Sequence, residues 1–144
     1  MMELTINGQV YQFNFGMGFL REMNQRVMVP VDKIKDMQKG IGLRYMIGSV
    51  MDGDLEALVD LLFAANKGES PRVTTMLLDN YIDNPETDVD QLFEDTLGFL
   101  RTANATRKTV EEIEKAVAAE KERQENLKKT LEKMQKKAQK EMKA

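Results

Sequence analysis

The chain has 144 residues, a formal net charge of −3 and neither histidine nor cysteine. These two absences remove disulfides, thiolate metal sites, the commonest zinc ligand and the commonest general base, so we expect a protein that is not an enzyme and that binds no metal or cofactor. The sequence begins without a basic and apolar leader and contains no apolar run of about 18 residues, which predicts a soluble cytoplasmic protein without a membrane partner.

A β-hairpin is predicted at the N-terminus. Glu3–Ile6 and Val10–Phe13 are strand-like segments that flank Asn7-Gly8, the dipeptide that most readily adopts the two positive φ angles of a type I′ turn. Side chains alternate along a strand, so each strand has one apolar face. A lone hairpin is only marginally stable, and we therefore expect this face to pack on helices.

The first predicted helix follows directly. Apolar residues recur at helical spacing from Phe15 to Val27, and the pattern stops before a proline. Within it, Met17 and Met23 are expected in the core. The next segment, residues 31–39, is polar and weakly patterned, which predicts a loop.

Four more helices are predicted before residue 104. The second spans Leu43–Val50, the third begins at the N-cap Asp54, and the fourth lies around Thr75–Ile82. Asp88 is the expected N-cap of the fifth, with Gln91 completing a variant of the capping box. The predicted apolar face of this fifth helix consists of Val89, Leu92, Phe93, Thr96, Leu97 and Leu100.

Two acidic segments contain the residue types of a cation site. Asp52-Gly53-Asp54 runs straight into a helix and lacks the further oxygen ligands of an EF-hand, so we interpret it as a turn and N-cap. The acidic run from Asp83 to Asp90 is interpreted as a helix start, where the helix dipole favours negative charge. Neither segment is expected to hold a metal.

The last part of the chain differs in composition, because residues 105–144 contain no glycine, proline or aromatic residue. They carry 12 basic and 8 acidic side chains, a net charge of +4, whereas residues 1–104 carry 9 and 16, a net charge of −7. We predict a compact body, 1–104, and a partly mobile Lys/Glu-rich helical arm, 105–144, which begins at a capping box of Thr109 and Glu112. The predicted fold class is mainly α (α+β), with an N-terminal β-hairpin packed on a bundle of about five helices and a long charged C-terminal helix.

One face of the arm is a candidate partner-binding surface. Leu127, Leu131 and Met134 lie at i, i+4 and i+7, so they share one side of a helix, but they are too few to fold it alone. We expect them to bind a neighbouring subunit, giving a homo-oligomer, or a helical partner protein. Lysines surround them without arginine or stacking aromatic residues, and the body is acidic, so nucleic acid is not the expected partner.

Several segments resemble one known family. They are Met2–Gly16, Phe19–Met23, Gly40–Leu43, Asp54–Ala65, Asp90–Phe93 and Asn104–Glu111. Together they resemble tail assembly chaperones of long-tailed (siphovirus-type) phages and prophages of Gram-positive bacteria. The similarity covers essentially the whole body and the start of the arm.

The resemblance implies a non-catalytic chaperone that binds the tape-measure protein in the host cytoplasm before the tail tube polymerises and that is absent from the mature virion. Some members of the family are also made in a longer form by ribosomal frameshifting, and the added domain recruits tail-tube subunits. From the residues alone, two alternatives stay open. One is a bacterial adaptor or regulatory protein with a helical partner, and the other is a nucleic-acid-binding module that uses the basic arm.

Overall fold

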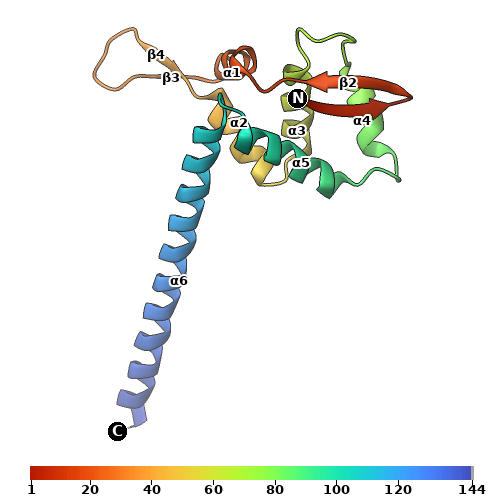
Figure 1. The fold of residues 1–144 in the computed structure, drawn as a ribbon. Coiled ribbons are helices and arrows are strands. Elements are labelled where there is room, and N and C mark those ends of the chain that lie inside the picture. Colours follow the sequence, from red (N-terminus) through yellow and green to blue (C-terminus); the bar gives the residue numbers. More distant parts are fainter. Residues whose placement is uncertain (144) are drawn as a thin grey trace. The chain divides into compact units, whose positions relative to one another are not determined.

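The computed structural model describes residues 1–143, which form two short antiparallel hairpins and six helices (Figure 1). The chain divides into two compact units, Met1–Glu111 and a second unit that begins at Glu112, and the boundary lies inside the last helix. The fold class is mainly α with some β, as predicted.

The N-terminal hairpin is confirmed. Strands β1 (Met2–Ile6) and β2 (Gln9–Phe13) are antiparallel, with Met2 opposite Phe13. Asn7 and Gly8 have φ angles of 52° and 78°, the two positive values that a type I′ turn requires. The hairpin buries one face, which includes Met2, Ile6, Tyr11 and Phe13.

Five helices belong to the first unit: α1 (Met17–Asn24), α2 (Gly42–Met51), α3 (Leu55–Ala65), α4 (Thr75–Asp83) and α5 (Val89–Thr102). Helix α3 is central, because it packs against α1, α2 and α4, while α2 also contacts α5. Buried residues occur on most sides of α3, as expected for a helix enclosed by its neighbours. Its fully buried leucines are Leu58, Leu61 and Leu62.

Side-chain caps fix where three of these helices begin. Asp54 accepts a hydrogen bond from the Ala57 amide at 3.2 Å and Asp88 accepts one from the Gln91 amide at 3.0 Å, which confirms both predicted N-caps. The reciprocal half of the predicted capping box is not formed, because the Gln91 side chain donates to Asp95 instead. The third cap, which was not predicted, is Thr74 of α4, whose hydroxyl accepts from the Leu77 amide at 3.1 Å.

A second hairpin lies between α1 and α2. Strands β3 (Met28–Pro30) and β4 (Gln38–Gly40) pair antiparallel, so the prediction of a loop over residues 31–39 is wrong at its C-terminal end. Each strand has only three residues, too few for an alternating pattern to be recognised. The pairing continues one residue beyond each end of the strands, because the Ile41 amide donates to the Val27 carbonyl at 2.8 Å and the Val31 amide donates to the Met37 carbonyl at 3.0 Å.

Helix α1 is shorter than its apolar pattern. It spans Met17–Asn24, so Val27 lies beyond its end. Met23 is fully buried, as predicted, but Met17 is 51% exposed and its assignment to the core is wrong. Met17 is the first residue of the helix, where its side chain lies beyond the packed part of the α1 surface.

Helices α1 and α2 approach closely at Gly42. A Cβ atom at this position would lie 1.7 Å from the Met23 carbonyl oxygen, so only glycine fits. The same approach lets the Asn24 side chain accept a hydrogen bond from the Leu43 amide at 3.1 Å, which satisfies a free donor in the first turn of α2.

We predict that Gly42→Ala lowers the free energy of unfolding by about 1–3 kcal/mol, because the added methyl group forces the two helices apart. Gly48→Ala in the same helix is the matched control, since a Cβ there meets no atom within 4 Å. Alanine has the better helix propensity, so the control is expected to be neutral or slightly stabilising. Urea denaturation of both variants tests this, and equal stabilities would contradict the close approach.

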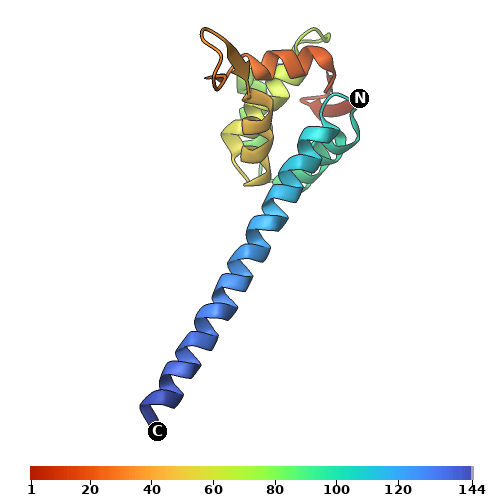
Figure 2. The same ribbon diagram turned by 90° about the vertical axis from the view of Figure 1, so that its left-hand side faces the viewer.

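Helix α6 (Arg107–Lys143) continues without interruption for 37 residues (Figure 2). It begins two residues before the predicted capping box, so the prediction of Thr109 as N-cap is wrong. The Thr106 carbonyl accepts from the Val110 amide at 3.1 Å and is already part of the helical ladder. Thr109 therefore lies within the first turn.

Candidate functional site

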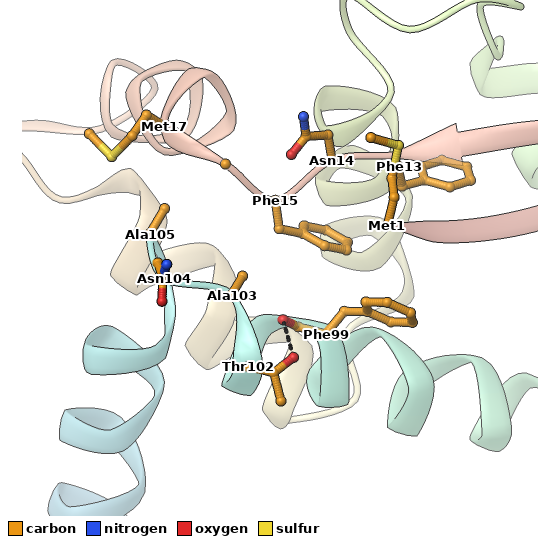
Figure 3. A pocket seen from close by; sticks show the side chains of 11 residues that line it. Met1, Phe13, Asn14, Phe15, Met17, Phe99, Thr102, Ala103, Asn104 and Ala105 are labelled. Carbon is orange, nitrogen blue, oxygen red and sulfur yellow. Dashed lines mark hydrogen bonds between the residues drawn. The ribbon is translucent and has the colours of Figure 1, made fainter.

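The first unit contains a cleft of about 570 Å³ between the β2–α1 connection and the C-terminal end of α5 (Figure 3). The residues on its β2–α1 side are Met1, Phe13, Asn14, Phe15, Gly16 and Met17. The residues on its α5 side are Phe99, Thr102, Ala103, Asn104 and Ala105. We call it the aromatic cleft.

Aromatic rings hold the inner wall of the cleft together. Phe15 is nearly buried and packs edge-on against Phe19, with ring centroids 5.2 Å apart. The Phe15 ring also faces that of Phe99 across the cleft at 6.5 Å (Figure 3). Phe99 is 38% exposed, so it is anchored on one side and accessible on the other.

Backbone hydrogen bonds fix the β2–α1 side. The Asn14 amide donates to the Ala65 carbonyl at the end of α3, at 2.8 Å. The Gly16 carbonyl then accepts from the Leu20 amide at 3.0 Å, which starts α1 immediately after the connection. Phe15 is therefore held between two fixed points, and its ring orientation follows from the fold.

Threonine side chains fix the opposite side. The Thr106 hydroxyl is buried and donates to the Leu100 carbonyl at 2.6 Å. The Thr102 hydroxyl donates to the Gly98 carbonyl at 3.1 Å. These bonds, with the Ala103 amide donating to the Phe99 carbonyl at 3.0 Å, hold the turn between α5 and α6 against the end of α5.

The chemistry of the aromatic cleft suits binding. Its lining contains no acidic or basic side chain, and its polar groups are two amides and one hydroxyl. Met1 and Met17 are exposed, and methionine adapts its shape to different partners. An anchored aromatic ring beside flexible apolar side chains is typical of a surface that binds protein.

Two further hollows border the cleft. One shares Phe99 and Thr102 with it and adds Glu94 and Asp95 of α5. The other shares Asn14, Gly16 and Met17 and extends to Lys67, which forms an ion pair with Glu22 at 3.0 Å. The apolar cleft thus has charged side chains beyond both ends, as in the polar rim of a protein interface.

The predicted stripe is elsewhere. Leu127, Leu131 and Met134 lie on α6 and are 59%, 51% and 63% exposed, and none of them lines the aromatic cleft. The sequence patterns do not indicate the cleft itself. The available signal was Phe99, an aromatic residue of the fifth helix that falls outside the predicted apolar face of that helix.

The acidic segments have structural roles in the fold. Asp54 and Asp88 cap helices, and Gly53 has a φ angle of 85° in the turn before α3. Within residues 1–143, acidic side chains form no group with the geometry to hold a metal ion. No helix in this described part of the chain is long and apolar enough to cross a membrane.

Comparison with known proteins gives one family. The family model described as phage tail assembly chaperone protein, TAC, matches residues 3–115. This range includes every residue of the aromatic cleft except Met1. No curated protein matches the chain significantly, and no solved structure does.

Proposed function

The chain belongs to the family of phage tail assembly chaperones, and we propose that it binds the tape-measure protein and keeps it competent for tail assembly. Members of this family bind phage tail proteins and are in general not catalytic. We extend this to the present chain, which we propose to act in the host cytoplasm, without catalysis, and to be absent from the mature virion.

The observation that carries this proposal is the aromatic cleft, which lies within the region matched by the family. A tape-measure protein is a long, largely helical chain with exposed apolar stripes, and a helix can place such a stripe in an apolar cleft. Phe99 offers a rigid anchor, while Met1 and Met17 can adjust to segments of different sequence. One surface could therefore bind many similar segments.

Weak individual contacts are sufficient for this role. Chaperone copies that are joined to one another would bind neighbouring segments of one tape-measure chain at a high effective concentration, so weak individual contacts would add up to avidity. Weak contacts also allow the chaperone to leave when the tail tube polymerises. We propose Leu127, Leu131 and Met134 as a second partner-binding surface, distinct from the cleft.

Co-expression with the tape-measure protein tests the cleft. We expect the double variant Met17→Ser/Phe99→Ala to bind the tape-measure protein at least about tenfold more weakly, since removing an interface anchor commonly costs 2 kcal/mol or more. Met17 is half-exposed, but Phe99 packs partly against Phe15, so some loss of stability is expected and binding is measured well below the melting temperature of the variant. Retention on the tagged tape-measure protein, followed by a titration, measures the effect.

Met76→Ser is the matched control for this experiment. Met76 is 72% exposed on α4 and does not line the aromatic cleft. The Met76→Ser variant should bind the tape-measure protein as strongly as the unmodified chain does. Equal binding by the cleft variant and the control would move the tape-measure site away from the cleft.

We also propose that the arm leads into a longer, frameshifted product that recruits tail-tube subunits. Its paired lysines, Lys128-Lys129 and Lys136-Lys137, support this proposal because two adjacent lysine codons can form a run of adenines on which ribosomes slip. Mass spectrometry of the products of the intact phage gene region tests this. Peptides that join the arm to a second reading frame are the expected result, and their absence would restrict the protein to its short form.

A further inference from the structure

A second groove lies between α3 and α4, with a volume of about 480 Å³. Its apolar residues are Leu55 and Val59, one turn apart on α3, and Ile82 on α4. Leu55 is 43% exposed although it belongs to the apolar face of its helix. The groove therefore leaves part of an apolar surface open to solvent.

Carboxylates line both sides of this groove. Glu56 and Asp60 lie four residues apart on α3, and Asp79 and Asp83 lie four residues apart on α4. No lysine or arginine lines the groove, and within residues 1–143 none of the four carboxylates forms an ion pair. Like charges at this spacing destabilise a helix by about 0.2–0.5 kcal/mol per pair. A positively charged partner would remove this repulsion.

The arm has the complementary surface. Leu127, Leu131 and Met134 form an exposed apolar stripe on α6. Lys128 and Lys137 are each three residues from a member of the stripe and so lie beside it on the helix surface. Other lysines cover the rest of this segment, at 129, 133, 136, 140 and 143. The stripe is therefore apolar in the middle and basic at its edges. The groove is also apolar in the middle, but the side chains at its edges are acidic.

We propose that the α3–α4 groove of one copy binds the Leu127–Leu131–Met134 stripe of a second copy. The apolar side chains of the stripe would cover the exposed Leu55 and the half-buried Ile82, above the buried Val59, and the lysines beside them would lie against the two rows of carboxylates. Self-association through these surfaces goes beyond the proposed binding of the tape-measure protein, because it uses neither the aromatic cleft nor any other protein.

Charge complementarity and the exposure of the stripe favour a second copy as the occupant. In the single chain, Leu127, Leu131 and Met134 of α6 are 59%, 51% and 63% exposed, and every copy carries both the stripe and the groove. A contact between two different surfaces is heterologous, so each copy can donate its arm and accept another.

A mixing experiment with full-length chains tests the proposal. The groove variant is Asp79→Lys/Asp83→Lys, and the stripe variant is Leu127→Gln/Leu131→Gln/Met134→Gln, in which glutamine preserves helix propensity. Sedimentation and light scattering over a concentration series measure association. We expect the unmodified chain to associate, more strongly at low salt, and each variant alone to associate at least about tenfold more weakly.

The equimolar mixture of the two variants gives the decisive result. The groove variant keeps an intact arm and the stripe variant keeps an intact groove, so the mixture should form a one-to-one heterodimer. The matched control for the groove is Asp90→Lys/Glu94→Lys, which reverses an exposed acidic pair at the same spacing on α5. This control should associate like the unmodified chain.

Several outcomes would overturn the proposal. If the unmodified chain is monomeric at every concentration and salt, self-association is excluded. An arm that binds the body of its own copy would give this same result. If the stripe variant loses association and the groove variant does not, the stripe binds another surface of the second copy or a different protein. A mixture that stays monomeric, or an equal loss in the α5 control, would also reject the pairing.

Discussion

Replacing Phe13 with alanine is expected to lower the free energy of unfolding by about 3–5 kcal/mol, the range for truncating a buried phenylalanine. Phe13 is fully buried at the end of β2, opposite Met2 on β1. A two-stranded hairpin is only marginally stable by itself, so its position depends on the apolar face that it packs against the helices. Removing the ring leaves a cavity at the point where the hairpin joins that core.

Val10→Ala is the matched control for this prediction. Val10 lies on the same strand but is exposed, so its truncation should cost well under about 1 kcal/mol. Urea denaturation of both variants gives the comparison. Because Phe13 also lines the aromatic cleft, the Phe13→Ala variant should also bind the tape-measure protein more weakly. A loss below about 2 kcal/mol would mean that the hairpin is peripheral.

Local sequence signals were sufficient to predict most of the helices and the first hairpin of the first unit. The pair Asn7-Gly8 determines the register of the hairpin, because each of these residues must adopt a positive φ angle. Asp54 and Asp88 mark helix starts, because a carboxylate can satisfy amides that the helix leaves free. These interactions span at most a few residues, which is why a single sequence predicts them.

Elements held by distant residues were harder to predict. Strands β3 and β4 have weak local propensity, and β4 packs closely on the end of α1, where a Cβ atom at Gly40 would lie 2.5 Å from the Asn24 carbonyl oxygen. The start of α6 depends on the buried Thr106 hydroxyl, which donates to the Leu100 carbonyl in the preceding helix. Thr109 had the better sequence signature, but tertiary packing determined the boundary.

The same distinction explains the two candidate surfaces. The Leu127–Leu131–Met134 stripe lies on one helix, so its spacing alone places its members together. The aromatic cleft joins Phe15 to Phe99, from segments that only the tertiary fold brings together. Leu55 lies at helical spacing with the buried Leu58, Val59 and Leu62, and yet it borders an open groove. Sequence patterns predict which residues share a face, but the fold determines which faces remain uncovered.

The side-chain amide of Asn66 is, like the ring of Phe13, important for the stability of the fold, because its hydrogen bonds join three segments of the first unit. The residue is fully buried and follows the last residue of α3. Its side-chain nitrogen donates to the carbonyls of Gln12, at 2.9 Å, and Pro71, at 3.3 Å. Its oxygen accepts from the Val73 amide at 2.6 Å and from the Arg72 guanidinium at 2.8 Å. One side chain thus joins β2, the end of α3 and the segment before α4.

We predict that Asn66→Leu lowers the free energy of unfolding by about 3–5 kcal/mol. Leucine has a similar volume, so little cavity forms, but it leaves the buried Val73 amide and the Gln12 carbonyl without their partner, at about 1–3 kcal/mol each. Asn80→Leu on the exposed side of α4 is the control and should be nearly neutral. Chemical denaturation measures both variants. A cost below about 1 kcal/mol for Asn66→Leu would mean that water can reach these groups and that this link between the hairpin and α3 is dispensable.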